Sequence, residues 1–262
     1  MGPSRLRSAR AAGGSIVAVL LLCGASLLRA QLGPLVSPFQ SPQAKTQEEL
    51  DIYLQIVTES DAAKVIREVA QLAGRYPESD LLGVAYQYQM FAYQRLNDFD
   101  GLLRAGHEAL RLQPKNLNTM LTLALAIPEA AGPRHDSAEL LNQAEQYARQ
   151  SLEEIPGMRI PRRVSMEQWQ ELRAEMTSRA HEALGSILLR RGNLEAGVAE
   201  LEAARRLNSD RTGIQYYKLG LAYAQSGKPG AAQEAWQQAA KLGPEGVREL
   251  ALKKLGTPNS KR

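Results

Sequence analysis

The stretch of sequence that decides the fold is residues 213–246, which read GIQYYKLGLAYAQSGKPGAAQEAWQQAAKLGPEG. Two runs of helix-forming residues are separated by Gly227, which permits a turn because it lacks a side chain. The small residues Gly220 and Ala232 allow two helices to approach closely, and Pro244 ends the second helix. The stretch therefore predicts two antiparallel helices joined by a tight turn.

The spacing of particular residues within this stretch carries a recognisable pattern. The positions that define it are Tyr216, Leu219, Gly220, Tyr223, Gly227, Ala232, Trp236, Ala239 and Pro244. Tyr223 and Trp236 are the large residues that fill the space between the helices. The pattern resembles the tetratricopeptide repeat, a helix–turn–helix unit of about 34 residues. The resemblance implies a solenoid in which such units stack side by side.

A unit that begins at Ser178 repeats the same scheme, and we assign it residues 178–211. Its matching positions are Leu184, Gly185, Leu188, Gly192, Leu194, Leu201 and Ala204. Chance is a poor explanation for two adjacent matches of this kind. Residues 83–116 form a further match, although Met90 stands where a small residue is expected and Gly106 where an aromatic one belongs.

The rest of the N-terminal half fits the pattern less closely. Residues 46–79 are a weaker unit, and residues 116–156 are a degenerate one. In the degenerate unit we expect the first helix to end at Pro128, because proline lacks the amide that a helix needs. We expect Asp136 and Glu139 to form a capping box at the start of the second helix.

A long helix is predicted after the irregular segment 157–166. Ser165 and Gln168 are spaced as a capping box, and the helical pattern then runs unbroken to Arg191. This helix is about twice as long as a usual repeat helix, so it is expected to begin before the repeat proper.

The predicted fold class is all-α. We expect a right-handed α-solenoid of antiparallel helix pairs over residues 46–256, in which an amphipathic helix at 245–256 covers the last unit. Residues 257–262 are a tail. The composition agrees, because strong helix formers dominate the long stretches and aromatic residues make up only 5% of the chain.

The charge of the chain argues against nucleic-acid binding. The formal net charge is +4, but the first 30 residues hold four arginines and no acid: Arg5, Arg7, Arg10 and Arg29. The remaining chain has 32 − 4 = 28 basic residues against 28 acidic ones, so its net charge is zero. A neutral body lacks the basic surface that binding to a phosphate backbone needs.

Residues 1–30 have the layout of a signal peptide. An arginine-rich start is followed by an uncharged apolar run, 16–28, and by Ala30, after which cleavage is possible. Cleavage after Ala25 is the competing possibility. The apolar run is shorter than the roughly 20 residues of a membrane-spanning helix. An uncleaved N-terminal membrane anchor is the alternative.

Cys23 is the only cysteine, and it lies inside the apolar run. It follows Leu22 rather than the small residue that lipid attachment requires, so we expect it to be an ordinary apolar member of the leader. Without the leader the body has no cysteine for a disulfide or a thiolate site. Residues 31–45 contain three prolines and are predicted to form an extended linker.

The sequence offers no set of residues for catalysis, for a cofactor or for a metal. The three histidines, His107, His135 and His181, are far apart in the chain, and none belongs to an HExxH motif. The two glycine-rich loops that bind phosphate, GxxxxGK[ST] and GxGxxG, do not occur in the sequence. The GxSxG motif, which carries a nucleophilic serine, is also missing. We therefore expect a chain that is not an enzyme and binds no cofactor.

The family resemblance implies a set of exposed groove residues, because the first helices of stacked units line the concave face. In three units these residues are Gln87, Phe91, Gln94, Arg95, Arg179, Glu182, Ser186, Arg190, Ile214, Tyr217, Leu221 and Gln225. Aromatic and arginine side chains are frequent anchors of interfaces. Members of the tetratricopeptide family that bind the C-terminal tails of chaperones hold the terminal carboxylate with a clamp of Lys, Asn and Arg side chains. Most of this clamp is missing here. Its positions are occupied by Gln87, Phe91, Arg179 and Leu221.

The predicted function is a non-catalytic scaffold, exported to the periplasm or cell envelope, that binds a protein or peptide partner in its concave groove. The alternative is an inner-membrane-anchored accessory subunit of an envelope-assembly, secretion or enzyme complex. Membrane contact is expected only through an uncleaved N-terminal segment, and no nucleic acid is expected. Arg95→Glu and Tyr217→Ala are expected to weaken partner capture and to leave helicity intact.

Overall fold

A computed structural model describes residues 42–132, 135–161, 164–207 and 212–256. Every regular element in these ranges is a helix. The helices are α1 (Gln47–Thr58), α2 (Ala62–Arg75), α3 (Leu82–Arg95), α4 (Phe99–Leu112), α5 (Leu117–Ala130), α6 (Ser137–Glu154), the 3-10 turn η2 (Ile155–Gly157), α7 (Met166–Arg190), α8 (Leu194–Leu207), α9 (Thr212–Gln225), α10 (Pro229–Leu242) and α11 (Glu245–Gly256). The prediction of an all-α fold is confirmed.

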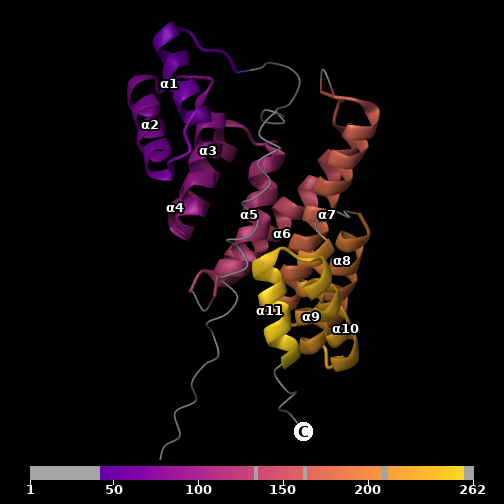
Figure 1. Cartoon of the computed structure of the whole chain (residues 1–262). Coiled ribbons are helices and arrows are strands. Elements are labelled where there is room, and N and C mark those ends of the chain that lie inside the picture. Colours follow the sequence, from indigo (N-terminus) through magenta and orange to yellow (C-terminus); the bar gives the residue numbers. More distant parts are fainter. Residues whose placement is uncertain (1–41, 133–134, 162–163, 208–211, 257–262) are drawn as a thin grey trace, which may run out of the picture.

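The helices pack in the order in which they follow one another along the chain. The pairs are α1 with α2, α3 with α4, α5 with α6, α7 with α8, and α9 with α10. The second helix of each pair also packs against the next helix in sequence, so the stack is continuous, and α11 covers α9 and α10. Figure 1 shows α1–α4 at one end of this stack and α9–α11 at the other. The predicted solenoid of helix pairs with a C-terminal capping helix is confirmed.

In four helix pairs the connection contains a residue with a positive φ. These residues are Asn97 (φ 56°), Gly132 (φ 40°), Gly192 (φ 81°) and Gly227 (φ 69°). Glycine adopts this conformation readily, and asparagine tolerates it better than most residues do. The expected turn at Gly227 is confirmed, and Asn97 makes the equivalent turn between α3 and α4.

The close approach of α9 and α10 depends on Gly220. A Cβ atom at this position would lie 2.3 Å from Trp236 Cδ1, which is closer than real carbon atoms approach. Gly185 has the same role between α7 and α8, where an added Cβ atom would lie 2.7 Å from Leu201 Cγ. The predicted pairing of a small residue with a large one is therefore present in both of the best-matching units.

Two predictions about the degenerate unit are wrong. Pro128 lies inside α5, which continues to Ala130. A proline in the last turn removes one hydrogen bond only, so the helix ends shortly after it rather than before it. Asp136 is the N-cap residue of α6, but its side chain makes no cap hydrogen bond. Its backbone (φ −93°, ψ 7°) is not in the extended conformation that a capping side chain needs.

The long helix α7 begins as predicted, at a capping box formed by Ser165 and Gln168. It has 25 residues, whereas its partner α8 has only 14. The N-terminal half of α7 therefore extends beyond α8 and packs on the start of α5. Its Trp169 and Met176 are buried in one apolar cluster with Met120 of α5. The additional half of α7 thus supplies apolar cover for the degenerate unit.

The predicted leader (1–30), most of the linker (31–45) and the tail (257–262) lie outside the described residues. Within the described ranges, no helix combines the length and the apolar character that crossing a membrane requires.

Candidate partner-binding site

The four predicted groove residues of α3 do not share one exposed surface. Gln87 is only 4% exposed, and its Oε1 accepts a hydrogen bond from Asn116 Nδ2 at 2.8 Å. Phe91 and Gln94 are half-buried, and Arg95 is exposed. Gln87 therefore joins α3 to the N-cap of α5 rather than facing a partner, which corrects the expectation for this residue.

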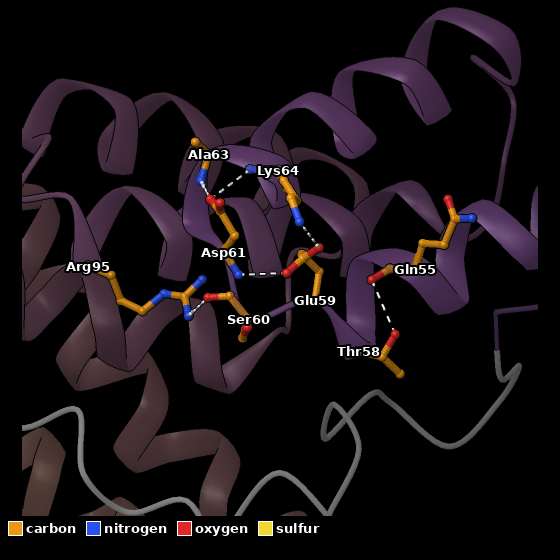
Figure 2. Close-up of polar contacts among 8 residues, drawn as sticks. All are labelled: Gln55, Thr58, Glu59, Ser60, Asp61, Ala63, Lys64 and Arg95. Carbon is orange, nitrogen blue, oxygen red and sulfur yellow. Dashed lines mark hydrogen bonds and ion pairs between the residues drawn. The ribbon is translucent and has the colours of Figure 1, made fainter.

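Arg95 binds the backbone at the end of the preceding first helix. Its Nη1 donates to the carbonyl oxygen of Ser60 at 2.7 Å, just beyond the end of α1 (Figure 2). In the same turn Asp61 caps α2, since its Oδ1 accepts from the amides of Ala63 and Lys64 at 2.8 and 3.2 Å. A guanidinium at a helix C-terminus is favourable, because the last carbonyl groups carry partial negative charge.

Arg190 makes the same kind of contact at the end of α5. Its Nε donates to Pro128 O at 2.6 Å, and its Nη2 donates to Glu129 O at 3.2 Å. Arg95 and Arg190 both occupy the thirteenth position of their repeat units. Of the three predicted groove arginines, Arg95 and Arg190 thus tie one helix pair to another, while both residues remain exposed.

Glu182 does not face solvent but belongs to a buried ion-pair network. Lys218 Nζ lies 2.8 Å from Glu182 Oε1 and 3.0 Å from Glu129 Oε1. Burial by itself would lower the pKa of Lys218, but the two carboxylates raise it above its ordinary value, so the ammonium group stays charged. The network joins α5, α7 and α9, which supply Glu129, Glu182 and Lys218 respectively.

Two further predicted groove residues also pack against the protein. Tyr217 is 2% exposed and lies in the apolar cluster of α9, α10 and α11, against which Ile214 packs as well. Arg179 is half-buried, and its Nη2 lies 3.4 Å from Thr122 Oγ1 on α5. The expectation that Tyr217→Ala leaves the helices undisturbed is therefore corrected, because this substitution removes a core side chain.

A pocket opens beside the Lys218 network, between α5, α7, α8 and α9. Its volume is about 120 Å³. Its lining residues are Pro128, Glu129, Ser186, Leu189, Arg190, Leu201, Lys218, Leu221 and Gln225. Four of the residues expected in a groove meet here: Ser186, Arg190, Leu221 and Gln225. The α3 residues Gln87, Phe91, Gln94 and Arg95, together with Arg179, Glu182 and Tyr217, do not line it.

The comparisons with known proteins agree with this architecture. No family model and no curated protein matches the chain. A solved structure of MamA (residues 41 to the end) from Desulfovibrio magneticus RS-1 matches with a TM-score of 0.56 and 14% identity, over 77% of this chain and 97% of that one. An RS-1 MamA double mutant matches with a TM-score of 0.55 and 13% identity, over 77% and 96%. MamA is a tetratricopeptide-repeat protein. The chain has the tetratricopeptide fold.

The tetratricopeptide pattern did not identify half of the pocket. Leu201 occupies a position that the pattern assigns to the packing between helices, and Lys218 occupies a position to which the pattern assigns no role. Leu189 has the same repeat position as Gln94 but was not among the predicted groove residues, and Pro128 and Glu129 come from the degenerate unit. Glu129 and Lys218 are 89 residues apart in sequence, so only the stacking of the units brings them together. No short-range signal in the sequence could have found this pair.

The lining of the pocket combines apolar side chains with a few polar and charged ones. Three leucines and a proline form apolar walls, and the side chains of Arg190, Gln225 and Ser186 provide polar groups. Among the described residues, no cluster of acids, histidines or cysteines could hold a metal ion. An apolar hollow with a few polar groups suits the side chain of a ligand or partner.

Proposed function

We propose that this chain is a non-catalytic scaffold that binds a partner protein or peptide at the pocket between α5, α7, α8 and α9. The observation that carries the proposal is a partly apolar pocket in which the half-buried lysine and glutamate of the lining are already paired with each other. Lys218 is bonded to both Glu129 and Glu182, so an entering side chain does not have to neutralise an isolated buried charge. Rigid, prepared pockets bind with less loss of conformational freedom.

Site-specific photo-crosslinking in the native host tests this proposal. A photoreactive residue at Gln225, which is exposed and lines the pocket, should capture a defined partner. A photoreactive residue at Arg104, exposed on α4 and outside the pocket lining, is the matched control and should not capture that partner. Mass spectrometry of the crosslinked products identifies what was captured.

A pocket-filling variant makes the test decisive. Ser186 is half-buried in the lining, and Ser186→Met places an apolar side chain in the space without weakening the helix. This variant should remove the crosslink formed from Gln225 and retain wild-type helicity. Undiminished capture by a well-folded Ser186→Met chain would refute the pocket as the binding site.

We further propose that the chain is exported and acts in the periplasm or cell envelope. The support is the sequence of residues 1–30, with four arginines ahead of and around an uncharged apolar run. The second candidate is an inner-membrane-anchored accessory subunit in which this run is retained. N-terminal sequencing of the protein from its host separates them, because a free Ser26 or Gln31 means cleavage and an intact leader means an anchor.

A further inference from the structure

The charges that line the pocket are unequal in their exposure. Glu129 and Lys218 form an ion pair at 3.0 Å, with side-chain exposures of 13% and 15%. Glu182, the second partner of Lys218, is 1% exposed and is not among the lining residues. Arg190 is the third charged residue of the lining, and it is exposed. The solvent-facing charge of this site is therefore a cation.

Arg190 is held in place by neutral groups. Its guanidinium donates to the carbonyl oxygens of Pro128 and Glu129. In the part of the chain that the structure describes, no carboxylate forms an ion pair with Arg190. Guanidinium has five N–H donors, and these two bonds occupy two of them. A fixed guanidinium with free donors is well suited to a carboxylate.

The pocket as a whole has the size of a single side chain. A cavity of roughly 150 Å³ lined by aliphatic groups holds a benzene molecule, and this pocket measures about 120 Å³. Leu189, Leu201 and Leu221 surround this space, and Leu201 is buried. The space therefore fits one branched aliphatic or phenyl side chain rather than a longer apolar segment.

We infer that the partner inserts one large apolar side chain between these three leucines and places the carboxylate of a neighbouring aspartate or glutamate on Arg190. This inference rests on the proposed function of the pocket and adds the chemistry of the partner. A partner lysine at the same place would meet a fixed like charge, since Glu129, the acidic residue of the lining, is already bonded to Lys218. The recognised unit is an apolar residue beside an acidic one.

Small probes of defined chemistry test the inference on the full chain. The first probe is N-acetyl-leucyl-aspartyl amide, whose amide end removes any terminal carboxylate. The second replaces its aspartate with asparagine, and the third replaces its leucine with serine. NMR titrations of leucine methyl groups should show shifts at the pocket leucines with the first two probes and none with the third. The aspartyl probe should bind about two- to fivefold more tightly than the asparaginyl probe at low salt.

Two substitutions assign the effect to the pocket. Arg190→Gln should abolish the preference for aspartate while leaving the leucine-dependent shifts. Arg95→Gln, at the same repeat position but outside the pocket lining, should leave the preference intact. Equal binding of the aspartyl and asparaginyl probes to the wild-type chain would overturn this inference and leave the proposed function standing. Probe-induced shifts that persist unchanged in Ser186→Met would overturn the pocket assignment itself.

Discussion

At the scale of single residues, the ion pairs of Lys218 determine how the pocket holds its shape. Lys218 on α9 bridges Glu129 on α5 and Glu182 on α7, and its side chain is 15% exposed. Removing one member of a buried charge network leaves the remaining charges poorly solvated. We expect Lys218→Met to lower the free energy of unfolding by about 3 kcal/mol, measured by urea denaturation.

Lys241→Met is the matched control for this substitution, because Lys241 is exposed on α10. We expect it to change stability by less than about 0.5 kcal/mol. If the two lysine variants are equally stable, the network does not stabilise the stack.

Glu49 provides a prediction about pH. It is 1% exposed, and its carboxylate accepts hydrogen bonds from the amides of Lys45 (2.6 Å) and Thr46 (3.3 Å) and from the hydroxyl of Ser79. Burial raises the pKa of Glu49, but the hydrogen bonds from Ser79, Lys45 and Thr46 outweigh burial and hold the pKa below its ordinary value of 4.5. The ionised form of Glu49 therefore stabilises the fold.

Because the folded-state pKa of Glu49 is depressed, its contribution is fully present above pH 4.5 and is lost as the pH falls through the folded-state value. We expect Glu49→Gln to be less stable than wild type at neutral pH, with a difference that narrows steadily below pH 4.5. Urea denaturation at a series of pH values measures this difference. A difference that is constant across the acidic range would show that folding does not lower the pKa of Glu49.

At the scale of helices, the fit between α9 and α10 is set by Gly220. We expect Gly220→Ala to lower the free energy of unfolding by about 1–3 kcal/mol, because the new methyl group would lie 2.3 Å from the nearest atom of Trp236. Thermal unfolding followed by circular dichroism measures the change. Gly230→Ala, in the first turn of α10, is the control, since nothing lies within 4 Å of an added Cβ atom. This control should be neutral or slightly stabilising.

The sequence could predict features that depend on neighbouring residues. The turn at Gly227, the fit of Gly220 with Trp236, and the cap formed by Ser165 and Gln168 all depend on residues within one unit or one helix end. Each has a local physical cause that can be read along the chain. The same reasoning failed at Asp136, where the predicted cap required a backbone conformation that the residue does not adopt.

The candidate site was less predictable, because it depends on contacts between units. The rule that selected groove positions treats every unit as an equal member of a regular stack. In the structure Gln87 bonds to Asn116, Glu182 bonds to Lys218, and Tyr217 is buried near α11. Exposure at these positions depends on the next unit rather than on the residue itself.

At the scale of the whole molecule, the helix pairs support one another mainly through their nearest neighbours. Separate apolar clusters lie at the two ends of the stack, one built from α1–α3 and the other from α9–α11. In such a solenoid, stability is close to a sum of local terms, so damage at one end spreads poorly to the other. The last helix covers the end of the stack with Val247 and Ala251, both fully buried.

Removal of α11 tests this property. We expect a chain that ends at Gly243 to expose the apolar face of α9 and α10, because Tyr217 and Trp236 share a cluster with Val247 and Ala251. Hydrogen exchange followed by mass spectrometry should show lost protection in α9 and α10. Protection in α1–α3 should remain close to that of the full chain, since these helices belong to a separate cluster. Equal loss of protection at both ends would mean that the stack unfolds as one cooperative unit. The stability of the pocket would then be tied to the stability of the N-terminal helices.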